Sequence, residues 1–205
     1  MATPGTAPVN VPAEPADFTH RARAALARHH PTAASDPKAA LAAVALVLSC
    51  RPDPSILLVR RRERAGDPWS GHMALPGGFN ATSDASLAVT AARETREEAG
   101  IDLDRCGAQI GVLSDVAPQS ALLPRVIVRP FVFAATTDCA PVAGEEVEEV
   151  VWLRVADMFS DASRKPLTLQ FPTGARTFTS IQVEGYVIWG LTERILGEFA
   201  SVVGL

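Results

Sequence analysis

The chain has 205 residues, 47% of them hydrophobic and 20% charged, and a formal net charge of -4 at pH 7. This length is typical of a single domain with a substantial core. The negative charge leaves no basic surface of the kind that nucleic acid requires, which argues against a nucleic-acid partner. No stretch approaches the apolar length of a membrane span, so we expect no membrane partner.

The cysteines predict free thiols. Cys50, Cys106 and Cys139 are odd in number, widely separated and without a Cys-x-x-Cys pattern. Such spacing favours reduced structural residues over disulfides or zinc ligands, and it favours a cytoplasmic location. The first sixteen residues lack the apolar run of a signal peptide.

Proline and alanine dominate residues 1–16, which we expect to be a flexible segment before a single domain over 17–205. Residues 17–30 predict a short helix, with Asp17 as a candidate N-cap and Pro31 as its stop. The adjacent His29 and His30 favour a solvated helix end over a metal site, because neighbouring side chains on a helix do not face each other.

Two apolar, β-branched runs follow, at 42–48 and 55–61, and predict two strands joined by a turn. Glycine and proline break the chain at 66–68, before a short strand or loop at 73–75. The second run ends in an arginine cluster. Because side chains alternate along a strand, only some of these arginines can reach a common ligand.

A helix that carries three glutamates comes next. Its predicted core face holds small residues at helical spacing, namely Ala88, Ala91, Ala92, Thr95 and Ala99. Glu94, Glu97 and Glu98 are neighbours on another face, where like charges repel unless a cation lies between them. Magnesium is commonly held by a few carboxylates together with substrate phosphates. Arg93 can pair with Glu97 four residues later, and Gly100 is the expected helix stop.

Further strands are predicted at 110–114, 126–135 and 147–155, and a last helix at 186–203. Several strands with one helix inserted and another at the end predict an α+β or α/β sandwich, in which a mixed sheet lies between helices.

Several residues are candidates for the ligand site. An acidic turn at 145–149 can complete the metal site, with Glu148 favoured over its neighbours, although a solvated turn is an equal alternative for each of them. Glycine pairs let backbone amides approach phosphate closely, and guanidinium groups bind it well. The substrate-binding candidates are Gly77, Gly78, Arg60, Arg62, His72 and Phe79.

The glutamate helix also carries a family resemblance. Residues 93–101 read Arg-Glu-x-x-Glu-Glu-x-Gly-Ile behind the glycine pair at 77–78, and this pattern resembles the Nudix box of nucleoside diphosphate-X hydrolases. In that box the arginine comes fourteen residues after the fixed glycine, whereas here that count reaches Phe79. This segment is therefore one residue longer than the usual box, and Asp84 lies near the position of the first glutamate of the pattern.

This spacing, together with the Gly-x-x-x-x-Pro-Gly-Gly run at 71–78, is similar to the coenzyme A pyrophosphatase branch. The resemblance implies a Nudix α/β/α sandwich and hydrolysis that depends on Mg²⁺ or Mn²⁺. It implies Glu94, Glu97, Glu98 and Arg93 as catalytic residues, of which the three glutamates bind the metal. The implied substrate is coenzyme A or acyl-CoA, cleaved to 3',5'-ADP and 4'-phosphopantetheine.

Four positions depart from the branch pattern and keep alternatives open: Asp67, Leu75, Phe79 and Ala81. ADP-ribose or another ADP-sugar is the alternative substrate, and a non-catalytic nucleotide-binding module is the alternative of a different class. The expected partner is a small-molecule nucleotide, and a homodimer is a further expectation.

Overall fold

The computed structural model describes residues 15–49, 53–63, 70–118, 124–136, 139–171 and 174–205. Most of the predicted flexible segment lies outside these residues, as do Cys50, Asp67 and the turn at 66–68.

A seven-stranded mixed sheet forms the centre of the molecule. Its middle strand β1 (Ala40–Ser49) runs parallel to β6 (Val126–Ala135) and antiparallel to β2 (Ser55–Arg61). The shorter or outer strands are β3 (Met73–Ala74) and β7 (Val147–Arg154) beside β2, β4 (Gly77–Phe79) beside β1, and β5 (Gly107–Val112) beside β6. The strands predicted from apolar runs are all present, with ends shifted by a few residues.

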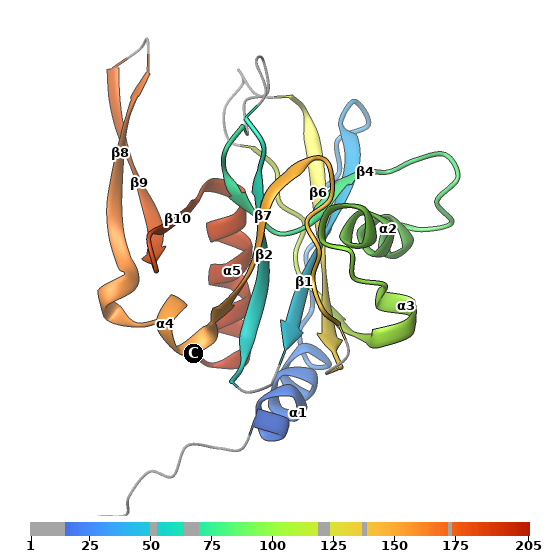
Figure 1. Cartoon of the computed structure of the whole chain (residues 1–205). Coiled ribbons are helices and arrows are strands. Elements are labelled where there is room, and N and C mark those ends of the chain that lie inside the picture. Colours follow the sequence, from blue (N-terminus) through green and yellow to red (C-terminus); the bar gives the residue numbers. More distant parts are fainter. Residues whose placement is uncertain (1–14, 50–52, 64–69, 119–123, 137–138, 172–173) are drawn as a thin grey trace, which may run out of the picture.

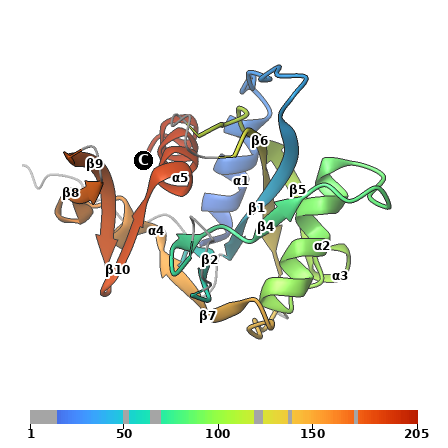
Figure 2. The ribbon, with the colours of Figure 1, turned by 90° about the horizontal axis from the view of Figure 1, so that it is seen from above.

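Helices cover both faces of this sheet, because β1 sends alternate side chains to two cores. Ala43, Ala45 and Val47 pack beneath α2 (Leu87–Ala99) and α3 (Leu103–Cys106). Leu46 and Leu48 join the core on the opposite face, where α1 (Pro15–Leu26) and α5 (Gly190–Val203) lie. Figure 2 shows the two pairs of helices on either side of the strands. The predicted sandwich with a mixed sheet is confirmed.

A second sheet extends from this sandwich. After β7, the short helix α4 (Val155–Met158) and a 3₁₀ turn (Asp161–Ser163) lead into β8 (Arg164–Phe171), β9 (Gly174–Val183) and β10 (Tyr186–Trp189). In Figure 1 the β8–β9 hairpin projects beside α5. The hairpin was not predicted from the sequence.

The last helix begins later than predicted, at Gly190 instead of Tyr186. Glu184 and Gly185 both have positive φ, of 51° and 84°, and form the two-residue turn that pairs Tyr186 with Val183. Such a turn matches the twist of the strands that it joins. Residues 186–189 therefore extend the small sheet, although their apolar spacing also suits a helix.

The first helix and His29, which follows it, also differ from the prediction. Helix α1 begins at Pro15, two residues before the predicted N-cap position, and ends at Leu26. His29 is not a solvated helix end, since its Nε2 lies 3.1 Å from an oxygen of Glu198 on α5, with 18% of the His29 side chain exposed.

The prediction of free thiols is wrong for two cysteines. Cys106, at the end of α3, forms a disulfide with Cys139. The two positions are 33 residues apart, and the fold brings them together where β6 leaves the sheet next to the start of β5.

No helix of the described residues is long and apolar enough to cross a membrane.

Candidate active site

Helix α2 is fixed at both ends. The Ser86 hydroxyl accepts a hydrogen bond from the Val89 amide, which caps the first turn. Gly100 ends the helix with φ of 69°, and its amide donates to the Arg96 carbonyl. Ala91, Thr95 and Ala99 are buried, as the small-residue face predicts. Because both ends and the core face are set, the position of each glutamate is set as well.

Glu98 lies on the sheet side of the helix, although it is charged. Its side chain is only 5% exposed, and one oxygen accepts a hydrogen bond of 2.9 Å from the Gly77 amide. The other oxygen lies 3.7 Å from a guanidinium nitrogen of Arg61. Burial, with smaller effects from Glu94 and Glu146, raises the pKa of Glu98 to about 7.

Arg93 organises the other carboxylates. Its guanidinium lies 3.0 Å from Asp84, 2.8 Å from Glu94 and 2.9 Å from Glu97, and it donates to the Phe79 carbonyl at 3.2 Å. The expected pairing of Arg93 with Glu97 is present. The hydrogen bonds from Arg93 lower the pKa of Asp84 to about 2, so Asp84 is an anion that anchors the arginine.

The two glycines of β4 admit different neighbours. A Cβ at Gly77 would meet the Ala43 carbonyl and Val44 of β1, so Gly77 lets the two strands approach. A Cβ at Gly78 would meet the carboxylate of Glu94. Gly77 and Gly78 thus form a short strand that supports two carboxylates, with the Gly77 amide already bonded to Glu98.

A second segment adds an acidic residue to this group. The segment before β7 docks on the end of α2, since the Gly144 amide donates to the Glu98 carbonyl at 2.9 Å. Glu146 follows, and its charge contributes to the raised pKa of both Glu94 and Glu98, for which burial is the main cause. The predicted Glu148 is exposed on β7 and is not among the charges that shift these two pKa values.

These carboxylates suit a divalent cation by their chemistry. The charge of Glu146 adds to the burial that raises the pKa of Glu94 and Glu98, and a cation among these hard oxygen donors would relieve the repulsion between them. Among the described residues no three such side chains already converge on one point. Arg93 holds Glu94 and Glu97, and the Gly77 amide holds Glu98, so binding of an ion would require some of these side chains to reorient.

The predicted substrate-binding residues are spread over the neighbouring surface. Arg60 lies 3.4 Å from Glu149 and over the Tyr186 ring, whereas its neighbour Arg61 is the arginine near Glu98. Arg62 is exposed, and its amide donates to the Glu146 carbonyl. The His72 ring meets Trp189 edge-on at 4.9 Å, and Phe79 is 53% exposed.

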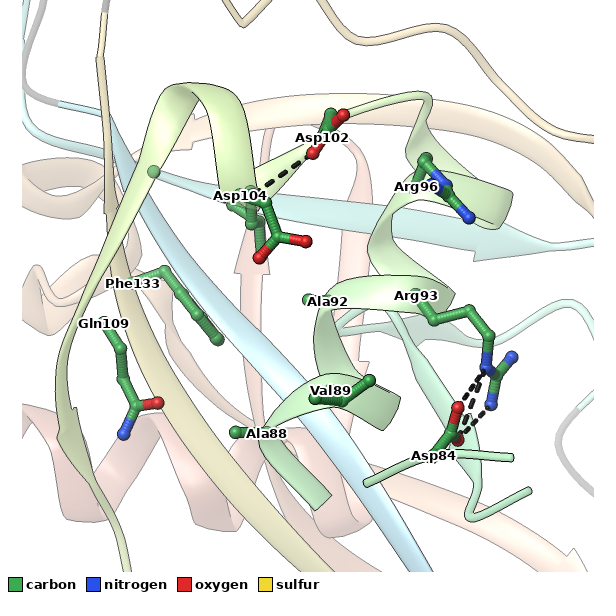
Figure 3. A pocket seen from close by; sticks show the side chains of 12 residues that line it. Asp84, Ala88, Val89, Ala92, Arg93, Arg96, Asp102, Asp104, Gln109 and Phe133 are labelled. Carbon is green, nitrogen blue, oxygen red and sulfur yellow. Dashed lines mark hydrogen bonds and ion pairs between the residues drawn. The ribbon is translucent and has the colours of Figure 1, made fainter. Parts of the chain in front are cut away.

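A groove of about 450 Å³ adjoins the site, between α2 on one side and α3 and β5 on the other (Figure 3). Its lining includes Asp84 and Arg93 at one end and Gln109 and Phe133 at the other. None of the three glutamates lines it. The groove therefore meets the carboxylate cluster only through the Asp84–Arg93 ion pair.

Sequence reasoning placed two residues of this site in its candidate groups but favoured their neighbours. Arg61, rather than Arg60 or Arg62, faces the glutamates, and alternation along β2 could have indicated this, because Leu57 and Val59 pack in the same core beneath α2. Glu146 had no local signal that distinguished it from its acidic neighbours.

Comparisons with known proteins agree with this geometry. Residues 40–171 match the model of the NUDIX domain. The Uncharacterized Nudix hydrolase NudL of Cronobacter sakazakii is 30% identical over 164 residues, which cover 80% of this chain and 82% of that protein. An uncharacterized protein of Schizosaccharomyces pombe is 38% identical over 109 residues, which cover 51% of this chain but 33% of that protein.

Among solved structures, a MutT/nudix family protein from Enterococcus faecalis superposes with a TM-score of 0.53, at 21% identity. The match covers 92% of this chain and 69% of the other, and at this identity it speaks to the fold alone. The domain match spans β1, the glutamate helix and the Glu146 segment, and the Cronobacter sakazakii relative aligns over most of both chains. The chain therefore belongs to the Nudix family and is a Nudix hydrolase of the pyrophosphohydrolase type.

Proposed function

We propose that the protein is a metal-dependent hydrolase that cleaves the diphosphate linkage of a nucleoside diphosphate derivative. The observation that carries this proposal is the grouping of Glu94 and Glu98 on α2 with Glu146 before β7, whose charge adds to the burial that raises the pKa of Glu94 and Glu98. A diphosphate resists attack by water mainly because of its own negative charge. A site that concentrates anionic oxygen ligands suits such a substrate when cations accompany it.

Glu94, Glu97 and Glu98 would hold Mg²⁺ or Mn²⁺, which are the ions that we propose, with the negative charge of Glu146 beside them. When bound, the cation supplies Lewis acidity that neutralises the charge of the diphosphate. Groups of the protein itself hold the carboxylates. Arg93 fixes the carboxylates of Glu94 and Glu97, and the Gly77 amide fixes that of Glu98.

Glu146 is our candidate for the base that takes the proton of the attacking water. It comes from a segment other than α2, it is exposed, and its charge acts on Glu94 and Glu98. Glu98 is less suited, because its side chain is 5% exposed and both of its oxygens have partners. We therefore place Glu98 among the ligands.

The substrate that we propose is coenzyme A or an acyl-CoA, with 3',5'-ADP and 4'-phosphopantetheine as products. The longer spacing from Gly78 to Arg93 supports this choice through the resemblance described above. Asp84 gives the added residue a structural role, since its carboxylate binds Arg93 at 3.0 Å. ADP-ribose is the alternative, and comparison of kcat/KM for the two substrates with Mn²⁺ decides between them.

Variants at 146 and 148 test the site itself. We expect Glu146→Gln to lower kcat by about 100-fold or more with little change in KM, because general bases contribute on this order. Glu148→Gln is the matched control, an exposed glutamate two residues away, and should keep near wild-type activity. Loss of activity in Glu148→Gln but not in Glu146→Gln would show that Glu146 is not the base. Failure of the wild-type enzyme to turn over any diphosphate would instead favour a nucleotide-binding module.

A further inference from the structure

The segment that leads into β7 is tied to the rest of the molecule at its first described residue. Cys139 is bonded to Cys106, at the end of α3. Just before it, the Thr136 amide donates to the Cys106 carbonyl at 2.7 Å. The start of the segment is therefore fixed to the layer that contains α2 and α3.

The middle of the segment is fixed to α2 itself, backbone to backbone. The Val142 amide donates to the Ala99 carbonyl at 2.8 Å, and the Gly144 amide donates to the Glu98 carbonyl at 2.9 Å. Carbonyls in the last turn of a helix have no partner within the helix. The segment supplies two of these partners, and Figure 1 shows it running beside α2 on its way to β7.

Gly144 is required for this approach. A Cβ at this position would overlap the carbonyl oxygen of Glu97, and that oxygen belongs to the helix backbone, which cannot rotate away. Two residues later the Glu146 carbonyl accepts a hydrogen bond of 3.1 Å from the Arg62 amide. The chain between Gly144 and β7 thus has little freedom.

We propose that the Cys106–Cys139 disulfide and Gly144 are positioning residues for Glu146, because together they hold the segment 139–146 against the end of the glutamate helix. This inference rests on the role proposed for Glu146. Neither the disulfide nor Gly144 contacts the substrate. They act through the placement of the Glu146 carboxylate relative to Glu94 and Glu98.

The test uses Cys139→Ser and Gly144→Ala in the full chain, with Cys50→Ser as the control for loss of a cysteine. We expect the first two variants to lower kcat by about tenfold and to weaken Mn²⁺ binding by a similar factor, with KM little changed. Calorimetry measures Mn²⁺ binding without substrate. Hydrogen exchange of the metal-free protein should show faster exchange over 139–146, and thermal melts confirm that each variant is folded.

Combination with Glu146→Gln separates positioning from a general loss of stability. If the segment acts through Glu146, the Gly144→Ala and Glu146→Gln double variant should be no less active than Glu146→Gln alone. Multiplicative losses would overturn the inference, as would full activity and unchanged Mn²⁺ affinity in both Cys139→Ser and Gly144→Ala. Full activity in Glu146→Gln would overturn both the proposed role of Glu146 and the positioning inference. The other contradicting results would overturn the positioning inference alone.

Discussion

Replacement of Glu98 by glutamine should stabilise the fold above neutral pH. Burial raises the pKa of Glu98 from its ordinary value of 4.5 to about 7. Each pKa unit corresponds to about 1.4 kcal/mol, so the ionised carboxylate lowers the free energy of unfolding by about 3 kcal/mol at pH 8. Glutamine carries no charge, and its amide oxygen can still accept the hydrogen bond from Gly77.

Urea unfolding in EDTA at pH 5 and pH 8 measures this effect. Between pH 4.5 and pH 7 the folded protein retains a proton that the unfolded chain has released, so wild-type stability falls as pH rises through this range. Glu98→Gln should exceed the wild type by about 3 kcal/mol at pH 8 and by about 1 kcal/mol or less at pH 5.

Glu97→Gln is the control, because its carboxylate is 52% exposed and its pair with Arg93 is worth under about 1 kcal/mol. The reasoning fails if Glu98→Gln is destabilised at pH 8, or if its difference from the wild type is the same at both pH values. With Mg²⁺ present, Glu98→Gln should show little activity. The carboxylate of Glu98 would thus lower the stability of the fold and also be needed for hydrolysis.

Other variants test residues that hold the carboxylates of the site in place and one ion pair that stabilises the fold. Gly77→Ala should lower the free energy of unfolding by about 3 kcal/mol, as seen in urea, because the added Cβ overlaps the Ala43 carbonyl. Arg93→Lys should reduce kcat by about tenfold or more in steady-state assays, since an ammonium group cannot reproduce the bonds of the guanidinium fork. Asp115→Asn should cost about 1–3 kcal/mol at pH 7. Although burial opposes it, the hydrogen bond from Arg129 lowers the pKa of Asp115 below its ordinary value of 3.8. The contribution of Asp115 is therefore full above about pH 4 and falls as pH drops further, so the stabilities of the two proteins should converge in acid-unfolding experiments below that pH.

The elements that carry the site could be predicted because their signals are local. The small-residue face of α2 and the glycine stop at Gly100 need no knowledge of the rest of the chain. Strand β1 is nearly all apolar, and β6 is apolar apart from Arg129 and Pro130, because both faces of these strands are largely buried. The Nudix box then identifies the chemistry through residue types at fixed spacing.

What the sequence analysis missed depends on contacts between distant segments. The Cys106–Cys139 bond joins positions whose spacing gives no indication of a pair. Residues 186–189 suit a helix by their apolar spacing, and only pairing with β9 makes them a strand. Our proposal of Glu146 in place of Glu148 rests on the docking of Gly144 on α2, which local patterns do not encode.

The most direct test of the account is turnover of coenzyme A by the purified protein with Mn²⁺ or Mg²⁺, compared between the wild type and Glu94→Gln. We expect 3',5'-ADP and 4'-phosphopantetheine from the wild type, no products in EDTA, and a rate at least about 100-fold lower in the variant. Products formed equally well by Glu94→Gln, or no turnover of coenzyme A, ADP-ribose or any other diphosphate substrate, would contradict the account.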